Sequence, residues 1–263
     1  KEIDFVGSHL AYLKEENVCA TTSDYSGYYI IPPMNFKGMQ ELLIGLQKED
    51  VYEYMLESHR HHCLNLRNDP NPSPFETNKI LGGNLAIKLE ALENIPPFFS
   101  SAYTVGGETV LTRGEDTLWG LAFQNAPVKC IDIDAPIFHD TYNSYPDVPD
   151  ILRDKSVQDR FYHACLGWIG RNPFLNWKSG KNLEECKAVQ LKNIEIGAKA
   201  LAKYTDNERF LMLPQALQIS YDRIHHVIQQ YNELQNAWDE LIQKLKEKGR
   251  RIHEDIDRQS FSV

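Results

Sequence analysis

The fold of this chain is decided by the stretch Arg113-Gly114-Glu115-Asp116-Thr117-Leu118-Trp119-Gly120. It begins a helix predicted over residues 115–124, because apolar side chains recur there on one face. Two adjacent carboxylates, Glu115 and Asp116, fall in the first turn, where unpaired backbone N–H groups and the helix dipole favour the ionised form. An ionised carboxylate can accept a proton from a substrate hydroxyl. Acidic residues also begin helices for stability alone, so this stretch by itself leaves a catalytic and a structural role open.

Strands and helices are predicted on both sides of this helix, which makes residues 1–146 an α/β region. A strand is expected over residues 128–133. Upstream, the pattern predicts a helix over 4–16, a buried strand over 17–22, helices at about 36–46 and 50–63, and a strand interrupted by two glycines over 79–88. Turn-forming residues predict connecting loops over 65–78 and 100–112.

Residues 147–263 have a different character and are predicted to form a helical C-terminal region. Helices are expected over 149–171, 182–204 and 207–249, with breaks near Asn172-Pro173, Ser179-Gly180 and Thr205-Asp206. In the last helix, apolar residues from Leu217 to Leu245 are spaced by 3.5 residues on average, which is the period of a coiled coil. A long helix packed on its neighbours and a dimerising coil both fit this spacing.

Composition narrows the class of protein. The chain has 263 residues, of which 42% are hydrophobic and 25% charged, so it can bury a core. Residues 1–146 hold 10 Lys and Arg against 20 Asp and Glu, a net charge of −10, whereas residues 147–263 hold 18 against 17, or +1. The total of −9 argues against nucleic acid as a partner. The acidic first part fits a pocket for a divalent cation or a solvated acidic surface.

The five cysteines form no CxxC pair, and their odd number argues against a disulfide framework. Reduced thiols indicate a cytoplasmic setting. No run approaches the roughly 20 apolar residues that span a bilayer. The basic segment 244–251 (KLKEKGRR) fits the C-terminal end of a helix, and it also fits contact with an anionic membrane surface or partner.

Two motifs stand in a recognisable order. Gly82-Gly83-Asn84 lies about 30 residues before Arg113-Gly114-Glu115-Asp116, and a strand and then His139 follow. Over roughly residues 1–145 this order resembles the second half of GT-A glycosyltransferases, in particular glycosyltransferase family 2. The resemblance implies a partial GT-A-like mixed sheet with flanking helices, in which residues 1–146 are the acceptor-side part.

The resemblance also implies roles for the motif residues. Asp116 matches the general base that deprotonates the acceptor hydroxyl in an inverting displacement, and Glu115 matches a neighbour that contacts acceptor hydroxyls. Gly82 and Gly83 match a turn where the backbone passes close to the donor sugar, as glycine permits. His139 matches a ligand of the divalent metal, Mn²⁺ or Mg²⁺, beside the diphosphate, or it is a histidine satisfied at a strand end.

Three further residues belong to the predicted substrate site. Asn84 and Arg113 stand within the two motifs. Trp119 fits either stacking on a sugar face or packing in the core. The implied partners are a nucleotide-sugar donor and a carbohydrate or other hydroxyl acceptor.

The chain departs from the family pattern at its start. A nucleotide-binding region that ends in an Asp-x-Asp metal motif should precede the first helix. Asp132-Ile133-Asp134 has the right letters but comes after the Glu-Asp motif, so it is predicted to be a strand end. Because the sequence starts at Lys1 without Met, we expect either a fragment of a longer protein or a fold that has lost nucleotide binding.

The sequence therefore predicts a glycosyltransferase with Asp116 as its base. The alternative is a non-catalytic, transferase-like interaction module that forms a homo-oligomer through its C-terminal helix. The dense run His59-Arg60-His61-His62-Cys63 is a weaker metal candidate, because only His59 with His62 or Cys63 would share a helix face.

Overall fold

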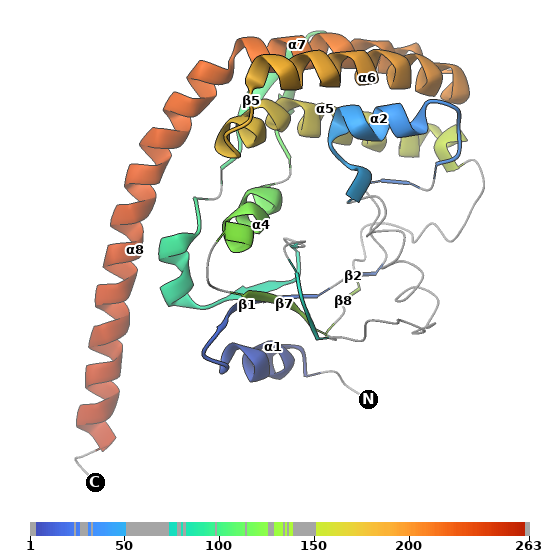
Figure 1. Ribbon diagram of the computed structural model, residues 1–263. Helices are drawn as coiled ribbons and strands as arrows, with labels where there is room; N and C mark the ends of the chain where they lie inside the picture. Colours follow the sequence, from blue (N-terminus) through green and yellow to red (C-terminus); the bar gives the residue numbers. More distant parts are fainter. Residues whose placement is uncertain are drawn as a thin grey trace.

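A computed structural model of the chain shows a small sheet and a layer of helices, with one long helix running along their side (Figure 1). The structure describes residues 4–23, 25–26, 31–32, 34–50, 74–77, 80, 83–97, 99–113, 115–125, 129–133, 135, 137–138 and 151–260. Apart from Asp50, the predicted helix at 50–63 lies outside these residues, as does most of the predicted loop at 65–78. The α/β class, the mixed sheet and the helical C-terminal region are confirmed.

The sheet has four strands in the order β3 (Phe75–Glu76), β7 (Lys129–Asp132), β1 (Val18–Thr22) and β4 (Leu85–Ile87). β1 and β7 are parallel, whereas β4 and β3 pair antiparallel at the two edges. Every residue of β1 is buried, as its apolar residues Val18, Cys19 and Ala20 predict for a central strand.

Helices cover this sheet. α1 (Phe5–Leu13) packs on β1, and it begins at Asp4, whose carboxylate accepts a hydrogen bond from the backbone N–H of Gly7. α4 (Glu115–Asn125) and the 3₁₀ helix η1 (Leu89–Asn94) share an apolar cluster with β1 and β7. Figure 1 shows α4 between the sheet and the helical layer.

Two very short strands extend the parallel pair. β2 (Tyr25–Ser26) follows β1 and pairs parallel with β8 (Ile137–Phe138), which follows β7. The chain segments that leave β1 and β7 therefore stay side by side beyond the carboxyl edge of the sheet.

The helical layer contains α5 (Lys155–Lys178), α6 (Leu183–Thr205), α7 (Leu213–Asp222) and also α2 (Met39–Leu46) from the first part of the chain. α2 packs closely on α6, because a Cβ on Gly197 would lie 2.5 Å from the Cα of Leu42. The predicted boundary between residues 1–146 and 147–263 therefore does not coincide with a boundary in the packing.

The predicted break at Asn172-Pro173 is wrong, because α5 continues through Pro173. Proline removes one N–H from the helical ladder, which usually kinks or ends a helix. Here Ile169 and Phe174 on either side are 0% and 2% exposed, so tertiary packing holds the helix together. The breaks at 179–180 and 205–206 are confirmed by the ends of α5 and α6.

Residues 100–112 are a β-hairpin rather than the predicted irregular connection. β5 (Ala102–Val105) pairs with β6 (Glu108–Leu111) across Gly106 and Gly107, whose φ angles are 58° and 82°. Two adjacent residues with positive φ are the requirement of a tight hairpin turn, and glycine meets it without strain. The hairpin packs on α5, where the hydroxyl of Tyr103 donates to the carbonyl of Leu166 at 2.7 Å.

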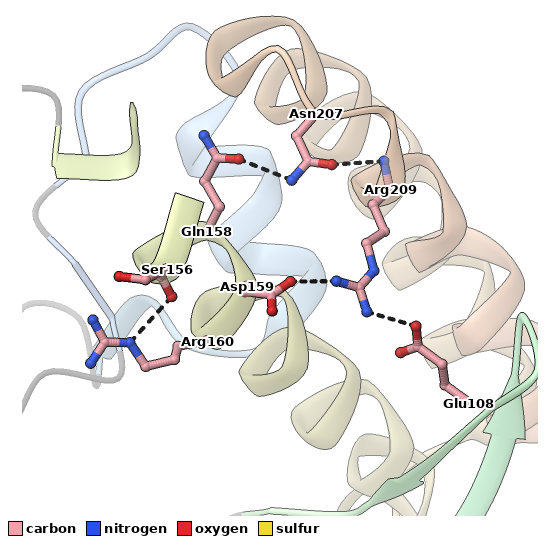
Figure 2. Close-up of polar contacts among 7 residues, drawn as sticks. All are labelled: Glu108, Ser156, Gln158, Asp159, Arg160, Asn207 and Arg209. Atoms are coloured by element: carbon pink, nitrogen blue, oxygen red, sulfur yellow. Dashed lines mark hydrogen bonds and ion pairs between the residues drawn. The ribbon is translucent and has the colours of Figure 1, made fainter. Parts of the chain in front are cut away.

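A polar cluster joins the hairpin to the helical layer (Figure 2). Arg209, in the 3₁₀ helix η3 (Glu208–Met212), bridges Glu108 on β6, at 2.6 Å, and Asp159 on α5. Its guanidinium also lies 4.5 Å from the ring centroid of Tyr162. Beside it, Asn207 donates to Gln158 at 2.9 Å.

The predicted helix at 207–249 is divided into η3, α7 and α8 (Ile224–Ser260). The first part of its apolar stripe packs within the chain, since Leu217, Tyr221 and Tyr231 are buried. Further along, Leu241 and Leu245 are 45% and 36% exposed. None of the described helices has the length and apolar character that a bilayer crossing requires.

Candidate functional site

The parallel pair β1–β7 fixes where a ligand site would lie. The carboxyl ends of these strands meet at one edge of the sheet, where Thr22 pairs with Asp132. β4 runs antiparallel to β1 and therefore begins at the same edge, with Leu85 opposite Thr22. In open α/β sheets, ligands bind in the crevice beyond the carboxyl ends of the parallel strands. The turn that carries Gly83 and Asn84 stands at this edge.

Asn84 is the central residue of this edge and is only 1% exposed. Its side-chain Nδ2 donates to the carbonyl of Ala135, after β7, at 3.1 Å. Its own carbonyl accepts from the backbone N–H of Ser23 and from the Thr22 hydroxyl, both at 3.1 Å. A single residue thus connects the ends of β1 and β7 with the start of β4.

His9 holds the other side of the Asn84 amide. Because Nδ2 of Asn84 donates to Ala135, its Oδ1 faces His9 Nε2 at 3.0 Å, and this ring nitrogen must carry the proton. His9 Nδ1, 2.8 Å from the Thr21 hydroxyl, then accepts a hydrogen bond. Burial lowers the pKa of His9, and the hydrogen bond to Asn84 opposes part of that shift. The ring is therefore a neutral structural group.

Ser23 completes the network. Its hydroxyl accepts from the backbone N–H of Ala135 at 3.1 Å, and the N–H of Ile133 donates to the Thr22 carbonyl at 2.9 Å. We call His9, Thr21, Ser23, Asn84 and Ala135 the edge network. It is buried, and it fixes the backbone from which the loops of the site leave.

The structure places four of the predicted site residues. Gly83 is exposed in the turn directly before the edge network. Asn84 uses its amide within that network, so any effect on substrate would come through the turn that it holds. Trp119 is half-buried against the apolar cluster of the sheet, and its Nε1–H donates to the Pro96 carbonyl at 2.9 Å. Of the two roles predicted for this residue, this position fits packing in the core.

Arg113 lies at the entry to α4. Its backbone N–H donates to the carbonyl of Gly167 at 3.0 Å, and a Cβ on Gly167 would lie 2.7 Å from the Arg113 side chain. The segment before α4 is therefore held against α5.

Other predicted residues cannot be placed in this way. Glu115 and Asp116 are the first two residues of α4, as predicted, but their side chains are not among the described parts. Gly82, His139 and the run 59–63 lie outside the described residues. Within the described part of the chain, no group of three His, Cys, Asp or Glu side chains is arranged to hold a metal ion. The roles of Asp116 and His139 stay predictions.

Sequence reasoning missed His9. Its signal was present, because His9 is a polar residue in an otherwise apolar helix, yet it is the residue of α1 that is buried. Phe5, Val6 and Leu10 on the same helix are exposed. The histidine faces inward since Thr21 and Asn84 satisfy both ring nitrogens there.

A polar cleft of about 980 Å³ lies at the start of α5 and the end of α6, beside the cluster of Figure 2. Its buried polar group is Gln158, which donates to the carbonyls of Leu152 and Thr205 and accepts from Asn207. The side-chain amide of Gln158 is therefore satisfied within the protein.

Comparisons of the chain with models of protein families, with characterised proteins and with solved structures found no match.

Proposed function

We propose that this chain is the acceptor-side part of an inverting glycosyltransferase that moves a sugar from a nucleotide-sugar donor to an acceptor hydroxyl. The observation that carries the proposal is the ordered pairing of Gly82-Gly83-Asn84 with Arg113-Gly114-Glu115-Asp116. It is supported by the position of the Gly83 turn at the carboxyl edge of β1 and β7.

In the proposed reaction, Asp116 accepts the proton of the acceptor hydroxyl while the oxygen attacks the anomeric carbon. The bond from that carbon to the diphosphate breaks, and the nucleotide diphosphate leaves with the bonding electrons. The first turn of α4 suits this base, because free backbone N–H groups keep a carboxylate ionised near neutral pH. Glu115 would orient the acceptor hydroxyls.

A divalent metal, held in part by His139, would neutralise the charge of the leaving diphosphate. Gly82 and Gly83 would let the backbone approach the donor sugar. In this scheme Arg113 borders the acceptor and Asn84 positions the glycine turn, whereas Trp119 packs in the core. The proposed setting is the cytoplasm, with segment 244–251 as the proposed contact with an anionic membrane surface.

The test is transfer by the full-length gene product from a panel of nucleotide sugars, in parent and Asp116→Asn forms. Removing a general base should lower turnover by about 10²–10⁴-fold. Asp206→Asn is the matched control, since Asp206 is an exposed residue in the left-handed conformation, which asparagine tolerates. Unchanged turnover in Asp116→Asn would reject Asp116 as the base.

One observation favours the second candidate, a self-associating interaction module. Leu241 and Leu245 continue the apolar stripe of α8 but remain exposed. Sedimentation of the full chain should then show a dimer that Leu241→Glu with Leu245→Glu dissociates, whereas Gln243→Glu, an exposed position outside the stripe, leaves it intact. A parent chain that stays monomeric would remove this candidate.

A further inference from the structure

A second cleft, of about 260 Å³, lies away from the edge network, among η1, α4, the end of α5 and α8. Five of its nine lining residues are apolar, and we call these five the apolar floor: Ile95 and Leu118 are buried, and Pro96, Leu121 and Ala122 are partly exposed. An apolar cavity of about 150 Å³ accepts benzene, so this space can hold one ring and a short linker.

A cation stands over this apolar floor. Lys178 Nζ lies 4.6 Å from the ring centroid of Tyr231 and 5.8 Å from that of Trp177. It donates to the Tyr231 hydroxyl at 3.1 Å, and that hydroxyl donates onward to Gln235 at 2.8 Å. The ammonium is thereby fixed above two aromatic faces.

The charge of this lysine is not neutralised by the acid in the lining. Glu93 forms its ion pair with Lys246 of α8. Across the described residues, no carboxylate lies within 4.0 Å of Lys178 Nζ. The cleft thus combines an apolar floor with an uncompensated positive charge at its rim.

We propose that this cleft binds an organic carboxylate with a small apolar body, the body against Leu118 and Ala122 and the carboxylate at Lys178. A charge-assisted hydrogen bond to the ammonium would select the anion, and the floor would select the apolar body. This inference does not depend on sugar transfer, because none of the motif residues that would act on the sugar takes part in it.

Three tryptophans outside the cleft contact residues that line it. The indole N–H of Trp119 donates to the Pro96 carbonyl at 2.9 Å, and that of Trp238 donates to the Ile95 carbonyl at 3.1 Å. Trp177 packs on Tyr231. A ligand that enters the cleft should therefore change the tryptophan fluorescence.

The test is a fluorescence titration with 4-phenylbutyrate, 4-phenylbutan-1-ol and 4-phenylbutylamine, which share one body and differ in the charge of the head group. We expect the carboxylate to bind with a Kd of roughly a millimolar or tighter. The alcohol should bind about tenfold more weakly and the amine more weakly still. Equal affinity for the three compounds, or no binding of the carboxylate, would overturn the proposal.

Variants separate the two parts of the cleft. Lys178→Met should remove the preference for the carboxylate, and Lys178→Arg should retain it. Lys181→Met is the matched control, because Lys181 is exposed, lies three residues away and does not line the cleft. Ala122→Leu should fill the floor and weaken all three compounds together, with thermal midpoints of unfolding recorded to verify folding. A preference that survives in Lys178→Met, or unchanged binding by Ala122→Leu, would count decisively against the site.

Discussion

Asn84→Ala should be among the most destabilising single substitutions in this chain. Alanine leaves two buried groups without their partner, the Nε2–H of His9 and the carbonyl of Ala135, now bonded at 3.0 and 3.1 Å. Leaving a buried polar group unsatisfied costs about 1–3 kcal/mol, so the free energy of unfolding should fall by about 2–6 kcal/mol for the two groups. That is a large share of the stability of an ordinary domain, about 5–15 kcal/mol.

The measurement is urea unfolding followed by tryptophan fluorescence, with Asn236→Ala as the control. Asn236 is exposed on α8, and its replacement should change the free energy of unfolding by less than about 0.5 kcal/mol. A double-mutant cycle with His9→Ala sharpens the test. The double variant no longer contains the Nε2–H donor that Asn84→Ala leaves without a partner, so its free energy of unfolding should fall by less than the sum of the two single losses. A loss below about 1 kcal/mol, or strict additivity, would refute the account of the edge network.

Three further outcomes are expected from urea unfolding. Burial lowers the pKa of His9 below its unfolded value of 6.5, so the folded chain binds fewer protons than the unfolded chain. The free energy of unfolding should therefore keep its full His9 contribution above about pH 6.5 and decrease below that pH, by at most about 1.4 kcal/mol per pH unit. His9→Gln should remove this pH-dependent contribution. Gly197→Ala would place a Cβ 2.5 Å from the Cα of Leu42 and should cost about 1–3 kcal/mol or more, whereas a near-neutral effect would contradict the close approach of α2 and α6. Gly107→Ala meets no atom within 4 Å but requires a φ of 82°, so the loss should be about 1–2 kcal/mol, from the backbone alone, and Gly107→Asn should lose less.

Local patterns predicted the elements whose environment the sequence already describes. The apolar run in β1 indicated a strand buried on both faces, and the acidic start of α4 indicated a helix beginning at Glu115. The Ser179-Gly180 break was predictable because glycine commonly ends a helix, and Gly180 adopts a φ of 68° just beyond α5.

Errors arose where distant packing or a specific turn decides the structure. Proline at 173 argues for a break, yet the burial of Phe174 among other helices outweighs it. The Gly106-Gly107 pair between two short β-prone runs is a hairpin pattern that the interpretation as a loop overlooked. Nothing local indicates that α2 belongs with α6, since that contact joins segments far apart in the chain.

The candidate site was only partly predictable. The motif with Asn84 was found from the order of residues, but its partner His9 lies 75 positions away, and no periodicity links the two. The role of Asp116 came from resemblance to a family, and its test remains the transfer assay.

The packing of α2 against α6 has a consequence for synthesis on the ribosome. From the end of α2 at Leu46 to the start of α6 at Leu183 there are 137 positions, and at about 5–20 residues per second these take roughly 7 to 27 s to translate. During that interval the leucines at 42, 43 and 46 have no cover from the helix that finally buries them. The nascent chain therefore exposes the apolar face of an amphipathic segment early in synthesis. We expect a holding chaperone to bind this segment.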